Sequence, residues 1–197
     1  IKNKLFFFLS GEMARRNSPT IFNAGDSNAL LTVAEASQLA DTLKNRYGYD
    51  AGAINAFDAE TQSNKAFARL DWNIRPGHQL TLRHNYIKAF DDNISRSPTF
   101  FRYGNNAYRF NNTQNITVAE LRSRFGSRFS NNLIIGKHTI RDFRTTYGSL
   151  FPSIEINKGA GTVQLGSDRS SVANELDQDI FFFTFNFKIF KNKHTFT

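Results

Sequence analysis

Hydrophobic and polar side chains alternate along several stretches of this chain, which is the period of a β-strand with two different faces. In residues 64–74, for example, Leu70 and Trp72 fall on one face and Arg69 and Asp71 on the other. The same alternation predicts six strands, at Asn3–Met13, Asn64–Ile74, Gln79–Phe90, Gln114–Phe125, Asn131–Tyr147 and Gln178–Phe190. A seventh strand is predicted to begin at Thr195–Thr197.

The predicted strands are longer than the ~5–6 residues usual in globular proteins. A strand that crosses a membrane at a tilt needs ~9–11 residues for the hydrocarbon core alone, so the lengths favour a membrane protein. The fifth strand is the least regular, because Ile140 and Arg141 break its alternation. That break predicts a β-bulge at this point.

Short and long connections alternate along the chain. The short ones are Arg75–His78, Gly126–Ser130 and Lys191–His194, and the long ones are Ala14–Ser63, Asp91–Thr113 and Gly148–Asp177. Outer-membrane barrels have this alternation, because their periplasmic turns are tight and their extracellular loops are long. The sequence therefore predicts an all-β fold: a segment of an antiparallel up-and-down transmembrane β-barrel, with about six complete strands and the start of a seventh.

One short amphipathic helix is predicted in the first long loop, at Val33–Arg46. Thr32 and Glu35 match a capping box, in which each side chain satisfies a backbone amide at the start of the helix. Gly48 is a suitable residue for the end of the helix. We expect the helix to fold over the mouth of the barrel or simply to order a long insertion.

The alternation assigns candidate residues to the two faces of the sheet. The polar face is expected to line a wet lumen, and its candidate residues are Arg69, Asp71, Asn73, Arg83, Asn85, Glu120, Arg122 and Arg124. The apolar face is expected to contact lipid or to form an aromatic girdle at the membrane interface, with Leu70, Trp72, Leu82, Tyr86, Phe181, Phe183, Phe185 and Phe187. Periodicity alone leaves open a soluble sandwich with its apolar face inside.

Composition excludes some classes of protein. The net charge is +8, but the basic residues are spread along the chain rather than gathered in a patch, so no nucleic-acid partner is expected. There is no cysteine, which excludes disulfides and cysteine-based metal or redox sites. The longest apolar run, Leu5–Leu9, is too short for a membrane helix. Ile1 follows no visible signal peptide, so the chain is expected to be a fragment.

No catalytic or cofactor site is predicted. The four histidines show no zinc-binding spacing, and His78 and His194 each end a tight turn. The run Asp91–Asn93 offers oxygen ligands for calcium, but a solvated start of a loop is the favoured interpretation. Two interpretations stay open for Glu120, Arg122 and the pair Arg141–Asp142: a wet network in the lumen, or ion pairs that stiffen the wall.

Several motifs resemble one known family. They are Arg69–Ile74, Gly77–Tyr86, Lys2–Phe8, Asn174–Asp179, Lys191–Thr195, Phe151–Ile154 and Gly166–Asp168. Together, and in this order, they resemble the barrel of TonB-dependent outer-membrane receptors, in particular the Oar-like receptors with a carboxypeptidase-regulatory-like N-terminal domain. The resemblance runs from end to end, and the loops match only loosely.

The resemblance implies a barrel of about 22 strands, closed by a plug domain and energised through the TonB complex. It implies a place in the outer membrane of a Gram-negative bacterium, contact with outer-membrane lipid and lipopolysaccharide, and uptake of a ligand that the sequence does not identify. The plug and most of the barrel have no counterpart here, so residues 1–197 are expected to be a partial barrel domain without enzymatic activity or cofactor. The alternatives are a passive porin-like or adhesion-type barrel, and a soluble β-sandwich that binds carbohydrate or nucleic acid.

Overall fold

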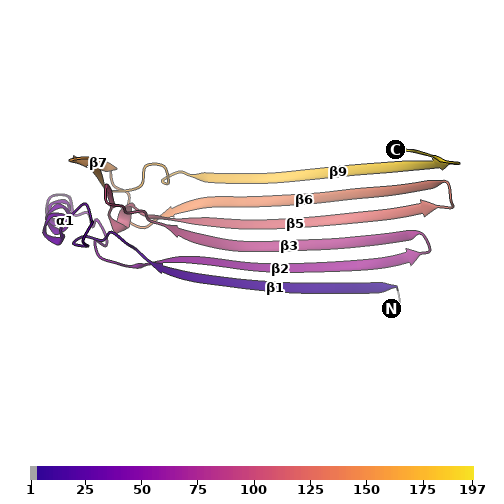
Figure 1. Cartoon of the computed structure of the whole chain (residues 1–197), viewed down its shortest axis with the longest axis horizontal. Coiled ribbons are helices and arrows are strands. Elements are labelled where there is room, and N and C mark those ends of the chain that lie inside the picture. Colours follow the sequence, from indigo (N-terminus) through magenta and orange to yellow (C-terminus); the bar gives the residue numbers. More distant parts are fainter. Residues whose placement is uncertain (1–3) are drawn as a thin grey trace.

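Most of the chain belongs to one antiparallel β-sheet in the computed structural model, which describes residues 4–197. The long strands are β1 (Leu5–Pro19), β2 (Asp58–Arg75), β3 (His78–Asn93), β5 (Tyr108–Phe125), β6 (Phe129–Thr146) and β9 (Glu175–Lys191), and the short β10 (His194–Phe196) follows β9. Each of these strands pairs with the next one along the chain, in the order β1-β2-β3-β5-β6-β9-β10 (Figure 1). The predicted antiparallel meander of long strands is therefore confirmed.

Most strands extend beyond their predicted bounds at one end. The first strand was predicted to end at Met13 but continues to Pro19, and the fourth begins at Tyr108 rather than Gln114. The β1 extension is polar on both faces, so alternation gives no signal there; the β5 extension does alternate at Tyr108 and Phe110 but was not recognised as strand. The backbone pairing continues without interruption in both. The predicted start of the first strand, Asn3, lies outside the described residues.

Short and long connections lie at opposite ends of the sheet, as predicted (Figure 1). The β2–β3 and β5–β6 turns contain Gly77 and Gly126, whose φ angles of 82° and 61° suit glycine. The β9–β10 turn uses Asn192 at φ 55°, one of the few other residues that accept this conformation. We call this end of the sheet the turn end.

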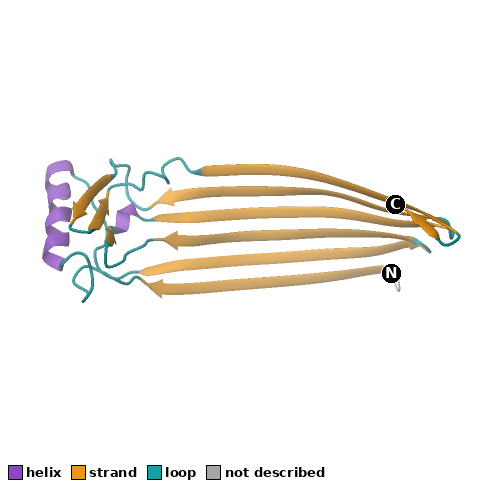
Figure 2. Cartoon of the chain, turned by 45° about the horizontal axis from the view of Figure 1, so that its top comes forward, coloured by secondary structure: helices purple, strands orange, loops and turns teal. Residues whose placement is uncertain are grey.

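The three long connections fold together at the other end into a small unit, which we call the cap (residues 20–57, 94–107 and 147–174). It contains the helix α1 (Val33–Tyr47), the 3-10 turn η1 (Gly104–Asn106) and the strands β4 (Phe100–Arg102), β7 (Ile154–Lys158) and β8 (Gly161–Leu165). These strands form a second sheet in the order β4-β8-β7, with β4 parallel to β8 (Figure 2). The sequence predicted only the helix.

The helix α1 begins and ends as its sequence predicts. The Thr32 side chain accepts a hydrogen bond from the Glu35 amide, the Glu35 carboxylate accepts one from the Thr32 amide, and Gly48 ends the helix at φ 68°. Among residues 4–197 no helix is long and apolar enough to cross a membrane.

The buried apolar core lies in the cap and not in the large sheet. Leu31, Ala36 and Leu43 from the first connection pack with Phe101 and Tyr103 from the second, and Val163 and Leu165 from the third complete the cluster. Polar contacts also join the connections: the Tyr103 hydroxyl donates to the Ala36 carbonyl over 2.7 Å, and the Asn106 amide donates to the Gly166 carbonyl over 3.0 Å. Contacts with the other two connections therefore hold each connection in a defined conformation.

Arg96 fastens the second connection to the first. Its buried guanidinium donates to the carbonyls of Ala53, Ile54, Asn55 and Arg102 and to the Asn23 side chain, and it lies 4.7 Å from the centre of the Phe101 ring. Burial lowers the pKa of Arg96 to about 10, which still leaves it charged at neutral pH. A guanidinium suits this position because its five donors can serve several carbonyls at once.

Two local predictions are wrong. The predicted bulge at Ile140 and Arg141 is absent, since both residues pair in regular register with β5 and β9. The alternation breaks here without a bulge because a β-strand admits a charged side chain on its apolar face where that face meets water. Asp91 and Asp92 do not begin a solvated loop but lie inside β3, where Asp92 forms an ion pair with Arg109 at 2.6 Å.

Candidate functional site

The strand register decides which side chains share a face, because directly paired residues of neighbouring strands point to the same side. One row runs through Leu70, Leu82, Ala119, Ile135 and Phe183, from β2 across to β9. Phe7 of β1 extends the row at the other side, opposite Leu70. The row is exposed: Phe183 is 66% accessible and Phe7 78%.

Neighbouring rows widen this row into an apolar belt. We define the apolar belt as Leu5, Phe7, Leu9, Ala66, Ala68, Leu70, Trp72, Leu80, Leu82, Tyr86, Ala119, Leu121, Leu133, Ile135, Phe181, Phe183, Phe185 and Phe187. All eight residues that the sequence assigned to the apolar face belong to it. On β9 the belt covers roughly 20–25 Å at ~3.3 Å per residue.

The opposite face, which we call the polar face, holds all eight residues that the sequence assigned to it. They are Arg69, Asp71 and Asn73 of β2, Arg83 and Asn85 of β3, and Glu120, Arg122 and Arg124 of β5. The register brings Asp71, Thr81 and Glu120 into one row. The polar residues of the individual strands therefore form one charged surface.

Most charges on the polar face are paired. Asp71 accepts hydrogen bonds from the Arg69 guanidinium at 2.8 and 2.9 Å and from the Thr81 hydroxyl at 2.6 Å. Arg122 donates to Glu120 at 2.8 Å. Glu120 and Arg122 therefore form an ion pair on this face, but Arg141 is not part of it.

Arg141 lies on the face of the apolar belt, where the belt gives way to charged residues. It binds Asp179 at 2.7 Å and approaches Asp177 to 3.5 Å, while Lys137 binds Asp179 at 3.2 Å. Lys137 also lies 5.0 Å from the centre of the Phe181 ring, the last apolar residue of β9 on this side. These ion pairs mark the edge of the belt toward the cap.

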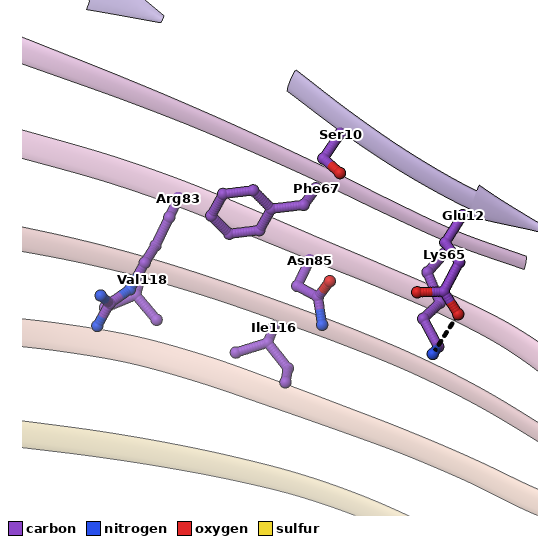
Figure 3. A pocket seen from close by; sticks show the side chains of 8 residues that line it. All are labelled: Ser10, Glu12, Lys65, Phe67, Arg83, Asn85, Ile116 and Val118. Carbon is purple, nitrogen blue, oxygen red and sulfur yellow. Dashed lines mark hydrogen bonds and ion pairs between the residues drawn. The ribbon is translucent and has the colours of Figure 1, made fainter. Parts of the chain in front are cut away.

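A hollow of about 440 Å³ lies on the polar face between β1, β2, β3 and β5. Its lining residues are Ser10, Glu12, Lys65, Phe67, Arg83, Asn85, Ile116 and Val118, and they project to one side of the sheet (Figure 3). Lys65 and Glu12 form an ion pair at 2.8 Å within it. The Arg83 guanidinium, by contrast, has no hydrogen bond or ion pair with any residue of the described chain 4–197.

Of the residues that line this hollow, the sequence named Arg83 and Asn85 as candidates on the polar face and missed the apolar ones. Phe67, Ile116 and Val118 occupy positions that the alternation assigns to the polar face. The signal available in the sequence is an apolar residue at a position where the alternation calls for a polar one. Only the register shows that three such residues from β2 and β5 lie close together.

Within residues 4–197 there is no cluster of three or more His, Asp or Glu side chains suited to a metal ion. The histidines of the long strands each form one side-chain hydrogen bond: His78 with Ser123, His84 with Thr117 and His138 with Gln114. The features that stand out chemically are therefore the two contrasting faces and the hollow. No protein-family model, curated protein or solved structure matches this chain.

Proposed function

We propose that this chain forms part of the barrel wall and the outer loops of a TonB-dependent outer-membrane receptor. In this proposal the apolar belt faces lipid, the polar face lines the lumen, and the cap lies on the extracellular side. The wall and the cap contact the ligand, while gating and energy come from other segments of the receptor. The sequence motifs Arg69–Ile74 and Gly77–Tyr86 support the choice of family.

The observation that carries the membrane part is the exposed apolar belt opposite a charged face. Each Å² of apolar surface left in water costs about 25 cal/mol, so a belt of this extent needs a cover. In a soluble sandwich a second sheet would cover it at ~10 Å. The described residues place no such layer over the belt, and lipid is the cover that fits a band of this height.

The strand edges also favour a closed barrel. The outer edge of β1 pairs with no strand of the described chain, so its peptide groups need partners. In a membrane, closure by further strands satisfies such groups. The long strands continue beyond the belt toward the cap with mainly polar residues on both faces, which suits a tube that projects into water.

Spin labels on single cysteines test which face meets lipid. The chain has no cysteine, so Leu70→Cys, Phe183→Cys and Asn85→Cys each give one label in it. In lipid vesicles, oxygen should relax the labels at 70 and 183 most strongly, because it concentrates in hydrocarbon. A water-soluble nickel chelate should relax the label at 85. Labels at 70 and 183 that neither reagent reaches would support the soluble sandwich instead.

Electrical recording separates the receptor from a passive pore. The complete receptor, reconstituted in planar bilayers, is expected to show no steady conductance, because a plug closes its lumen. A porin-like barrel would conduct continuously, and this result would overturn the assignment to the receptor family while keeping the barrel.

A further inference from the structure

The hollow on the polar face contains a positive charge, Arg83, that no side chain of the described residues neutralises. Arg69 of β2 and Arg83 of β3 pair directly, so two guanidinium groups project side by side. Like charges at directly opposed positions destabilise a sheet. Asp71 neutralises Arg69 at 2.8 Å, but none of residues 4–197 forms an ion pair with Arg83. A bound anionic ligand would neutralise Arg83 and so relieve the repulsion between the two guanidinium groups.

Apolar side chains lie beside this charge. The register sets Val118 directly opposite Arg83, and Ile116 opposite Asn85. The Phe67 ring lies over the same hollow, between Ser10 and Asn85 (Figure 3). Phe67 also meets the Phe8 ring, with ring centres 6.0 Å apart, which holds it at the wall. Apolar walls with a few polar groups are typical of sites for small organic ligands.

The volume and the remaining charges narrow the class of ligand. About 440 Å³ lies within the ~300–1,000 Å³ range of small-molecule sites. Lys65 and Glu12 neutralise each other, so they add little net charge. A guanidinium binds a carboxylate or sulfonate through two parallel hydrogen bonds. Asn85 and Ser10 offer further polar contacts at the rim.

We propose that this hollow binds a small organic anion with an apolar body. Arg83 holds the anionic group, and Phe67, Ile116 and Val118 pack against the apolar part. The inference rests on the proposed function, since it requires the polar face to be open to solutes. It names a class of ligand that the wall receives: a carboxylate or sulfonate attached to a ring or an alkyl chain.

Protection of a single cysteine in the complete receptor tests the site. Ser10→Cys is nearly isosteric and places a thiol at the hollow. Its rate of modification by a water-soluble methanethiosulfonate reagent is measured with and without 4-phenylbutyrate as the probe. We expect 4-phenylbutyrate to slow the modification at least threefold. Butyrate, which lacks the ring, and 4-phenylbutan-1-ol, which lacks the charge, should each slow it less than 1.5-fold.

Variants assign the effect to the two halves of the hollow. In the Ser10→Cys background, Arg83→Gln and Phe67→Ser should each abolish the protection, and Arg83→Lys should keep part of it. Arg124→Gln removes a charge from the same face outside the hollow and should leave the protection unchanged. Equal protection by the alcohol, or full protection in Arg83→Gln, would overturn the proposal.

The outcomes separate this inference from the proposed function. A thiol at position 10 that reacts but is not protected overturns the ligand site alone. A thiol that no reagent modifies also overturns it, because the hollow is then closed to solutes. The proposed function is judged independently, by the labels at positions 70 and 183.

Discussion

Gly136 of β6 and Phe182 of β9 pair directly on the polar face, and the Phe182 ring fills the space above the glycine. A Cβ atom at position 136 would lie 2.2 Å from Cζ of that ring. A glycine in a strand normally weakens the sheet, since it has no side chain to pack. Here the aromatic ring supplies the missing packing from the neighbouring strand.

We expect Gly136→Ala to destabilise the sheet, because the added methyl group forces the Phe182 ring out of position. The expected loss in free energy of unfolding is about 1–3 kcal/mol, typical of overpacking. The urea midpoint of the protein folded into lipid vesicles measures it. Gly11→Ala is the matched control, since its Cβ would meet only the Lys65 carbonyl at 3.9 Å. An unchanged midpoint for Gly136→Ala would show that the ring moves at no cost.

At the scale of one element, the helix α1 depends on its first turn. The Glu35 carboxylate accepts from the Thr32 amide and binds Lys158 of β7 at 2.6 Å. The Lys158 hydrogen bond, with those from Thr32, lowers the pKa of Glu35 from 4.5 to about 2. One carboxylate thus caps the helix and attaches it to the small sheet of the cap.

The sign of the pH dependence follows from this lowered pKa. The folded cap favours the ionised form of Glu35. The stabilisation of the cap by this carboxylate is therefore complete above the unfolded pKa of 4.5 and decreases as the pH falls toward 2. We expect hydrogen exchange of the α1 amides, corrected for the intrinsic rate, to accelerate from pH 5 to pH 2.5. Glu35→Gln should remove most of this change. A change of equal size in Glu35→Gln would assign it to another group, such as Asp168.

At the scale of the whole molecule, the proposed function places the two faces of the sheet in different surroundings, and adjacent residues of β9 test this. Phe183 lies in the apolar belt, while Thr184 lies on the polar face opposite Ile134. Phe183→Arg should destabilise the protein in lipid vesicles by about 2–4 kcal/mol, the cost of a charge on a lipid face near the midplane. Thr184→Arg should cost less than about 0.5 kcal/mol, as for an ordinary exposed site.

Urea unfolding in vesicles measures both variants. Equal and large losses would indicate that both faces are buried in protein, as in a larger sandwich. Equal and small losses would indicate that both faces meet water. Either result would contradict the proposed membrane orientation.

The sequence by itself determined the local features. Period-two alternation gave the strands and the division of residues such as Leu70 and Arg69 between two faces, because a strand turns successive side chains to opposite sides. The capping box at Thr32 and Glu35 and the glycine at position 48 gave the helix, because these contacts join residues near in sequence. The dipeptide Pro76-Gly77 likewise predicted a turn, because a turn depends only on a few consecutive residues.

The tertiary structure decided what depends on residues far apart in the chain. The core of the cap joins Leu43, Phe101 and Val163, and no local pattern predicts that three loops will pack together. The hollow joins Ser10, Phe67 and Arg83 with Val118, which only the register of four strands brings to one place. Pairing across strands is a long-range choice, so chemistry that arises between strands becomes visible only in the folded sheet.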